Sequence, residues 1–289
     1  MTTTLSAADL RALAETDAVQ PLHDDQLRLV LSAPPFVHVP GTYNIRDLGL
    51  VPSPRADADV GQRLRPRFAY RAGALTALTD EGKAALRDKL GVRKVFDLRT
   101  VREREHGPAP SLDGIPIVWI ETEEKDALVD LPTFREGEGE VGYRRMYLDV
   151  LRVYRPNFRA VLEHVRDHPE EPFLFHCTAG RDRTGVLAGL LHALAGADPD
   201  TIVLDFLLSR VGTEPVREML LAFAMRGAGV QSTDAPGFQN MCNLRASCWR
   251  AFLDGVEEEY GGFEDYVTKA LGFSEQDVAT IKRNLVSRD

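Results

Sequence analysis

Apolar runs of strand length alternate with amphipathic stretches of helical length along the middle of the chain. The runs are rich in β-branched or aromatic side chains, which is typical of buried strands. Because helical stretches separate them, we expect an α/β fold with a mainly parallel central sheet that is flanked by helices. The strand candidates are residues 68–71, 92–98, 115–120 and 172–175.

Capping residues indicate where the helices begin. Ser6 starts a capping-box pattern and Asp24 precedes a second helical stretch, so residues 1–35 are predicted to form an N-terminal helical extension. A partly alternating run at 36–43 predicts an edge strand that opens the main domain, residues 36–289. After the last strand the pattern is helical throughout. The helices predicted in the main domain are 79–90, 143–153, 156–167, 185–195, 198–210, 213–226, 243–260, 263–271 and 275–287.

Length and composition fit one globular domain with helical additions. The 289 residues approach the size at which single cores stop growing, and 44% hydrophobic with 27% charged residues is ordinary. The net charge of −9 argues against nucleic-acid binding, which needs a basic face. The 3 cysteines form neither a disulfide framework nor a zinc pattern. No signal peptide or membrane span is visible, so we expect a cytoplasmic protein without stable membrane insertion. The oligomeric state stays open.

A polar stretch at residues 176–185, with the sequence HCTAGRDRTG, separates the last predicted strand from an apolar helix. A strand, a tight loop and a helix in this order direct the loop N–H groups and the helix N-terminus to one point, which suits phosphate. Gly180 and Gly185 permit a tight turn and close approach of a ligand. The residues predicted to bind phosphate are Thr178, Ala179, Gly180, Arg181 and Thr184.

The same stretch carries the groups that cleave a phosphomonoester. That reaction needs an in-line nucleophile, neutralised phosphate oxygens and a proton for the leaving group. Cys177 is the candidate nucleophile, because a helix N-terminus and a nearby cation favour a thiolate. Arg183 presents a planar fork to two phosphate oxygens, and Thr184 is expected to donate its hydroxyl to the departing thiolate. His176 is expected to fix the loop. No metal or other cofactor is required, because the loop amides and Arg183 neutralise the phosphate.

These residues resemble the signature of the protein tyrosine phosphatase superfamily, a cysteine and an arginine separated by five residues. The finer pattern of residues 176–185 is similar to the compact bacterial and fungal tyrosine/serine phosphatase branch. The flanks match in order across about 36–287. The matching segments are Asn44–Gly49, Arg71–Leu75, Asp97–Thr100 with Glu103, Asp205–Ser209 and Tyr266–Leu271.

The resemblance implies an enzyme that works through a phosphocysteine on phosphotyrosine, and leaves phosphoserine, phosphothreonine and phosphoinositides open as further substrates. Its partner would be a phosphorylated protein or a small phosphomonoester. It also implies that the helices of about 198–289 include a lid over the active site. The branch usually carries a lysine, associated with phosphoinositide recognition, where this chain has Arg181. Arginine keeps the charge but changes its reach and hydrogen-bond geometry.

Two aspartates are candidates for the general acid. Asp182 lies inside the loop, at a position where branch members also carry aspartate. Asp97 follows another strand and could approach the same crevice, or it could pair structurally with Arg71 or a backbone amide. The carboxylates within 121–126 also follow a strand, as a mobile acid loop would, or they are simply solvated. We rank Asp182 first and Asp97 second.

Other functions stay open at this point. They are a phosphatase for inositol phosphates or other small molecules, a non-catalytic phosphate-binding module, and a sulfur transferase with a similar cysteine loop. The intact set of Cys177, Asp182, Arg183 and Thr184 disfavours the non-catalytic module. The pair of Arg183 and Thr184 disfavours the sulfur transferase.

Overall fold

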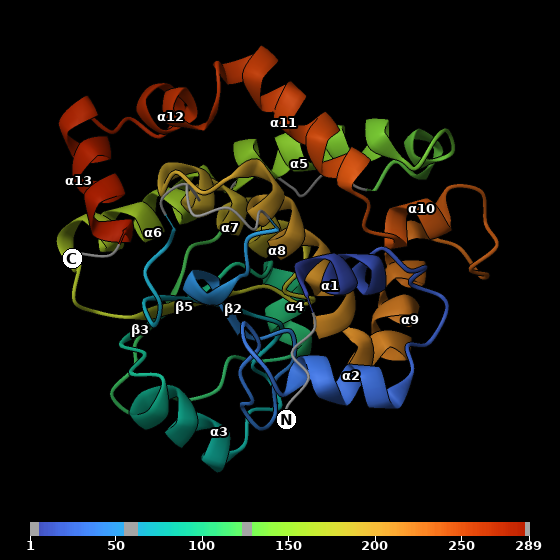
Figure 1. The fold of residues 1–289 in the computed structure, drawn as a ribbon, viewed down its shortest axis with the longest axis horizontal. Coiled ribbons are helices and arrows are strands. Elements are labelled where there is room, and N and C mark those ends of the chain that lie inside the picture. The colour runs from blue at the N-terminus through green and yellow to red at the C-terminus, as the bar shows by residue number, and fades with distance from the viewer. Residues whose placement is uncertain (1–5, 55–62, 123–128, 287–289) are drawn as a thin grey trace.

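The computed structural model describes residues 6–54, 63–122 and 129–286 (Figure 1). Its centre is a five-stranded sheet in the order β1-β2-β5-β3-β4. β1 is antiparallel to β2, and the other neighbouring strands are parallel. The strands are β1 (Arg46–Asp47), β2 (Ala69–Ala72), β3 (Lys94–Asp97), β4 (Ile117–Trp119) and β5 (Phe173–His176).

Helices lie on both faces of this sheet (Figure 1). Side chains alternate between the faces along β5, as the strand geometry requires. Phe173 and Phe175 join the larger apolar cluster with α6 and α7, and Leu174 joins a smaller cluster with the helical residues around α3. The helices are α1 (Ala7–Ala14), α2 (Asp24–Leu31), α3 (Asp80–Ala84), α4 (Val101–His106), α5 (Glu140–Val153), α6 (Arg155–Asp167), α7 (Asp182–Leu194), α8 (Pro199–Gly212), α9 (Arg217–Ala228), α10 (Phe238–Cys242), α11 (Ala246–Tyr260), α12 (Phe263–Asp265) and α13 (Glu275–Leu285).

The register of the sheet places the end of β5 between two other strand ends. His176 lies opposite Ala72 of β2 on one side and opposite Asp97 of β3 on the other. The carboxyl ends of parallel strands share one edge of a sheet, where ligands bind in α/β proteins. The loop after His176 therefore starts at the middle of that edge.

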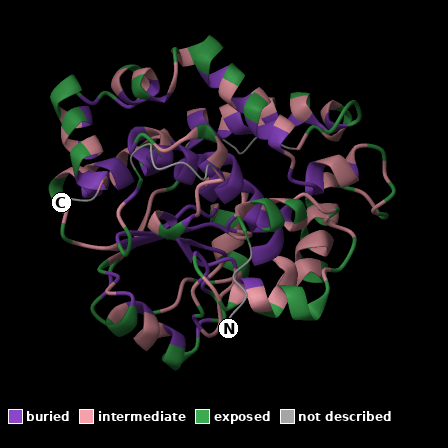
Figure 2. Cartoon of the chain, in the orientation of Figure 1, coloured by how far each residue is buried: buried purple, intermediate pink, exposed green. Residues whose placement is uncertain are grey.

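The two helices after this loop form the centre of the molecule. α7 and α8 are apolar and buried on nearly all sides, as Figure 2 shows by the buried residues at the middle of the cartoon. A helix that is apolar all round belongs in a core. The N-terminal end of α7 is thus fixed by packing on the body of the protein.

The N-terminal helices lie against this core rather than apart from it. α1 packs on α8, and Arg210 of α8 donates from Nη2 to the carbonyl oxygens of Asp17 and Gln20 at 3.1 and 2.6 Å. The capping box of Ser6 with Asp9 is present as the sequence predicts. A boundary at residue 35 stays a prediction. No helix within the described ranges is both long and apolar enough to cross a bilayer.

Most predicted elements are confirmed within a few residues, and the differences concern short ones. The predicted edge strand at 36–43 is wrong, because the chain turns at Pro40 and Gly41, whose φ is +88°, and only Phe36 forms a bridge, to Arg46. The edge is formed by β1 instead. α4 and α10 were not predicted, since five or six residues are too short to show helical periodicity.

Candidate active site

Donors from the N-terminal half of the chain hold the carbonyl oxygens of residues 178–181. Tyr43 donates from its hydroxyl to the carbonyl oxygen of Thr178 at 2.7 Å. Asn44 donates from Nδ2 to the carbonyl oxygens of Ala179 and Gly180 at 3.0 and 2.9 Å. Arg71 donates from Nη2 to the carbonyl oxygens of Gly180 and Arg181 at 2.7 and 3.3 Å. Because the C=O and N–H of a peptide point in opposite directions, these bonds help turn the loop N–H groups inward.

The inward N–H groups form an anion site. Those of residues 178–183 make no hydrogen bond to any other part of the chain that the structure describes. Gly180 makes the turn possible, because its φ is +64° and a Cβ there would lie 2.3 Å from the carbonyl oxygen of Ala72. The row of free donors continues into the N-terminus of α7, whose dipole adds positive potential. An arrangement of this kind binds phosphate.

A buried carboxylate anchors these donors. Asp205 of α8 accepts hydrogen bonds from Nε of Arg46 at 2.7 Å and from Nη1 of Arg71 at 2.5 Å. Arg46 also donates from Nη1 to Oδ1 of Asn44 and from Nη2 to the hydroxyl of Ser209. Burial raises the pKa of Asp205, but the two guanidinium groups outweigh it and hold that pKa well below its usual range. One ionised side chain thus supports the loop through both arginines.

A second carboxylate fixes the loop arginine. Nη1 and Nη2 of Arg183 each donate to Glu103 at 2.6 Å, in a bidentate pair. Glu103 also accepts from the hydroxyl of Thr178, and from the N–H of Thr100 at 2.8 Å as part of the capping box that starts α4. Burial raises the pKa of Glu103, but the charge and hydrogen bonds of Arg183 lower it to about 2. The short helix α4 therefore sets the orientation of the guanidinium.

We expect Glu103→Gln to lower kcat/KM for phosphomonoesters by at least about tenfold, because a hydrogen bond between charged groups contributes about 1.5–3 kcal/mol to holding Arg183. Steady-state kinetics with one aryl phosphate would measure this loss. Glu105→Gln is the matched control, since Glu105 is an exposed residue of the same helix. Equal losses in both variants would contradict the role of Glu103.

The two remaining charged residues of the loop bind each other. Arg181 donates from Nε to Oδ1 of Asp182 at 3.0 Å, and Tyr147 of α5 donates from its hydroxyl to the same oxygen at 2.9 Å. The rest of the Arg181 guanidinium donates to the carbonyl oxygens of Met241 and Cys242 at 3.2 and 3.0 Å. Arg181 is therefore directed toward α10, although the sequence placed it among the phosphate-binding residues.

Asp97 is engaged by its own neighbours. Its carboxylate accepts from the N–H, Nε and Nη2 of Arg99 at 3.0, 2.9 and 2.8 Å, and its side chain has no exposed surface. The predicted pairing with a backbone amide is confirmed, with Arg99 as the donor, whereas Arg71 bonds to Asp205 instead. Burial lowers the pKa of the adjacent His176, which favours the neutral ring, and Nδ1 of His176 lies 3.3 Å from the carbonyl oxygen of Cys177. Of the acidic residues after β4, Glu121 is exposed, whereas Glu123 and Asp126 lie outside the described residues.

Cys177 and Thr184 lie at the buried base of the loop. Cys177 is 2% exposed, at the point where β5 ends. The hydroxyl of Thr184, in the first turn of α7, is buried without a hydrogen-bond partner among the described residues. A free hydroxyl at this point is available to a group bound in the loop.

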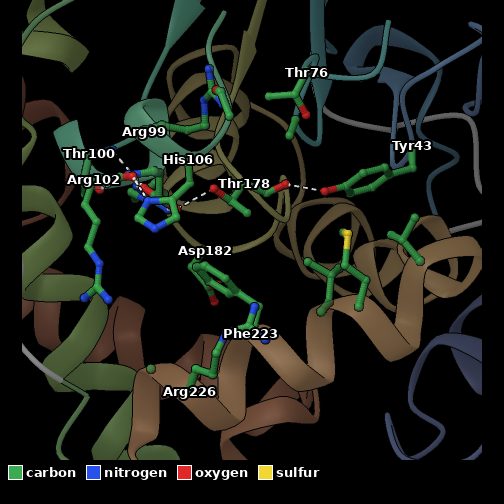
Figure 3. Close-up of a pocket in the computed structure, with 18 of the residues that line it drawn as sticks. Tyr43, Thr76, Arg99, Thr100, Arg102, His106, Thr178, Asp182, Phe223 and Arg226 are labelled. Carbon is green, nitrogen blue, oxygen red and sulfur yellow. Dashed lines mark hydrogen bonds and ion pairs between the residues drawn. The ribbon is translucent and has the colours of Figure 1, made fainter.

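A cavity of about 1000 Å³ opens above the loop (Figure 3). Its polar end is lined by Asp182 and Arg183, with Tyr43 at one side. Its outer walls are largely apolar and include Met219 and Phe223 of α9, which are 50% and 42% exposed. α9 belongs to the region that the resemblance implies to be a lid. A substrate must enter between apolar walls to reach the loop.

Comparison with known proteins identifies the family. The model of the tyrosine phosphatase family matches residues 37–287. The chain belongs to this family. A tyrosine-protein phosphatase of Nostoc commune is 33% identical over 221 residues, which cover 74% of this chain and 73% of that protein. The triple specificity protein phosphatase PtpB of Mycobacterium tuberculosis is 29% identical over 278 residues, 85% of this chain and 96% of PtpB.

A solved structure also resembles the chain. It is the core catalytic domain of the PP-IP phosphatase SIW14 from S. cerevisiae, with a TM-score of 0.32 and 16% identity, covering 57% of this chain and 91% of that one. Membership of the tyrosine phosphatase family makes this protein a cysteine-dependent phosphatase. The predicted α/β fold with a mainly parallel sheet is confirmed.

Sequence reasoning gave no site role to several residues that hold the loop. Asp205 has the clearest signal in the sequence, because it is the one carboxylate in an otherwise apolar run at 202–208. Glu103 carried a signal as well, since Thr100 and Glu103 have capping-box spacing. Tyr43 and Asn44 lie in an irregular segment, where no periodicity indicates what their side chains contact.

Proposed function

We propose that this phosphatase hydrolyses phosphotyrosine in proteins, with Cys177 as the nucleophile. The observation that carries the proposal is the row of N–H groups at residues 178–183 without a hydrogen-bond partner in the described structure, beside the oriented guanidinium of Arg183. These donors match the equatorial oxygens of a phosphoryl group under attack. No metal is assigned a part, because the loop and Arg183 supply the positive charge.

The reaction runs in two displacements. In the first, the Cys177 thiolate forms an S–P bond while the bond from phosphorus to the tyrosyl oxygen breaks, and Asp182 gives its proton to that oxygen. In the second, Asp182 takes a proton from water as the water oxygen attacks phosphorus. The S–P bond breaks, and Thr184 donates a hydrogen bond to the departing thiolate.

The shape of the cavity supports an aryl phosphate as substrate. Tyr43, Met219 and Phe223 line the route to the loop. An aromatic ring buries more apolar surface between such walls than the short methylene of phosphoserine does. Arg181, at the position linked to phosphoinositide recognition, is bound to Asp182 and to α10. We therefore place phosphotyrosine ahead of phosphoserine and of inositol phosphates.

Matched substrates test this order. Peptides of one sequence that carry phosphotyrosine or phosphoserine at the same position, together with a soluble phosphoinositide, give three values of kcat/KM. We expect phosphotyrosine to lead by at least about tenfold, the effect of roughly 1.4 kcal/mol of added apolar burial. Equal or higher values for the phosphoinositide would contradict the proposal.

We expect Asp182→Asn to lower kcat for a phosphotyrosine peptide by about 10²–10⁴-fold, the usual contribution of a general acid. With p-nitrophenyl phosphate the loss is smaller, because that leaving group needs less protonation. Comparing kcat for the two substrates measures the effect. Asp149→Asn is the control, since Asp149 lines the same cavity. If Asp97→Asn and not Asp182→Asn shows this dependence on the leaving group, the acid is Asp97.

A further inference from the structure

The carboxylates that line the active-site cavity are already neutralised. Each one has an arginine partner within the described structure, so none of them is left to repel an anion or to bind a further cation. The pairs are Glu103 with Arg183 at 2.6 Å, Asp182 with Arg181 at 3.0 Å and Asp149 with Arg152 at 3.1 Å.

Two other arginines line the same cavity without a partner among the described residues. The guanidinium groups of Arg102 and Arg226 make no hydrogen bond or ion pair with any described residue, and both side chains are exposed. Figure 3 shows them on different walls, Arg102 on the α4 side and Arg226 on the α9 side. They give the mouth of the cavity a positive charge in a protein whose net charge is −9.

Local structure explains why both arginines face the cavity. Arg226 follows Phe223 by three residues on α9, so the two share a helix face, and both line the cavity. Arg102 immediately precedes Glu103, which α4 directs at the loop arginine. His106, one helical turn after Arg102, lines the same wall. The elements that position the catalytic loop and the cavity wall therefore also position the two free cations.

We propose that Arg102 and Arg226 form a second anion subsite, which binds a further phosphate on a peptide whose phosphotyrosine occupies the catalytic loop. The inference rests on the proposed phosphotyrosine activity. Two guanidinium forks suit a dianionic phosphate, which offers three acceptor oxygens, better than a single carboxylate. The substrate class is thus a protein segment with two phosphorylated side chains near each other.

Charge favours a peptide over a membrane as the carrier of the second phosphate. The net charge of −9 repels an anionic lipid surface, whereas a short peptide meets only the local positive potential of the cavity mouth. Both cations line the cavity that leads to the catalytic loop, so a flexible chain can carry its second phosphate to them. A phosphoinositide headgroup is the competing carrier of the same chemistry, and the experiment includes it.

The test uses tyrosine-phosphorylated peptides of one sequence, with a second phosphate placed one to four residues away on either side or omitted. We expect at least one spacing to raise kcat/KM by about tenfold or more over the singly phosphorylated peptide, from charge-assisted hydrogen bonds. In the double variant that combines Arg102→Gln and Arg226→Gln, the ratio of kcat/KM between the doubly and singly phosphorylated peptides falls toward one. Arg250→Gln, an exposed arginine of α11, keeps the gain. Added salt reduces the gain in the unmodified protein.

Several outcomes would overturn the proposal. The subsite is wrong if no spacing gives a gain, or if the double variant keeps it, while the singly phosphorylated peptide is still hydrolysed. A gain from a second phosphate on a short-chain phosphoinositide, but on no peptide, would exclude a peptide as the occupant. If the singly phosphorylated peptide is not hydrolysed and other phosphomonoesters are, the phosphotyrosine activity itself is wrong.

Discussion

Cys177→Ser is expected to lower the turnover of every phosphomonoester by at least about 10⁴-fold, because removing an activated nucleophile has effects of this order. A serine hydroxyl at this buried position is far less ionised than a thiol, while the loop donors and Arg183 stay in place. The variant should therefore bind a phosphotyrosine peptide about as tightly as the unmodified protein does. Stopped assays measure turnover, and calorimetry with the peptide measures binding.

Cys248→Ser is the control for this substitution. Cys248 is also buried, and its thiol donates to the carbonyl oxygen of Glu138 at 3.3 Å, a bond that serine can keep. Its activity should stay close to that of the unmodified protein. Substantial turnover in Cys177→Ser would rule out the phosphocysteine mechanism. Loss of both turnover and binding would show that the loop had collapsed, and the role of Cys177 would then have to be tested by trapping its phosphorylated form.

Asp205→Ala is expected to destabilise the protein by about 3–5 kcal/mol, because it leaves the buried guanidinium groups of Arg46 and Arg71 without their carboxylate. Asp205→Asn keeps some of the hydrogen bonds, so its free energy of unfolding should lie between those of the unmodified protein and Asp205→Ala. Urea unfolding gives the free energies, and Asp254→Ala on the exposed face of α11 is the control. A cost under about 1 kcal/mol, the value of a surface ion pair, would contradict the anchoring role.

The stability that Asp205 contributes is expected to depend on pH. The pKa of Asp205 is lower in the folded protein than the usual unfolded value of about 3.9, so its contribution is fully present above that value. The contribution is lost as the pH falls toward the folded pKa. The difference in unfolding free energy between the unmodified protein and Asp205→Ala should therefore be constant near neutrality and shrink in acid.

The sequence predicts best what is coded within a few neighbouring residues. The strands follow from apolar runs, and the loop at 176–185 follows from one continuous string. Contacts between residues that lie far apart in the sequence were not predicted. Glu103 meets Arg183 across 80 residues, and nothing local to either side chain indicates the other. The guanidinium of Arg181 donates to carbonyl oxygens of α10, about 60 residues further along the chain, and no local pattern indicates that contact.

Asp97 illustrates the same limit for a charged residue at a strand end. Its position on β3 correctly placed it beside the loop, since the register pairs it with His176. The partner that occupies its carboxylate, Arg99, is only two residues away, yet its reach depends on the turn that the chain makes after β3. A strand end therefore predicts where a side chain starts, whereas the side chain's partner depends on the path of the backbone beyond it.

The outward carbonyls of the catalytic loop have a consequence for folding. Their donors are distant in the chain, since Tyr43 precedes Thr178 by 135 residues, and the link from Arg71 to Asp205 spans 134. Contacts between residues this far apart in the chain form late in folding, because the entropic cost of closing a large loop must be overcome first. A chain emerging from the ribosome thus acquires its phosphate site only after α8 has been synthesised and docked. Catalytic activity in this protein therefore requires that α8 has docked.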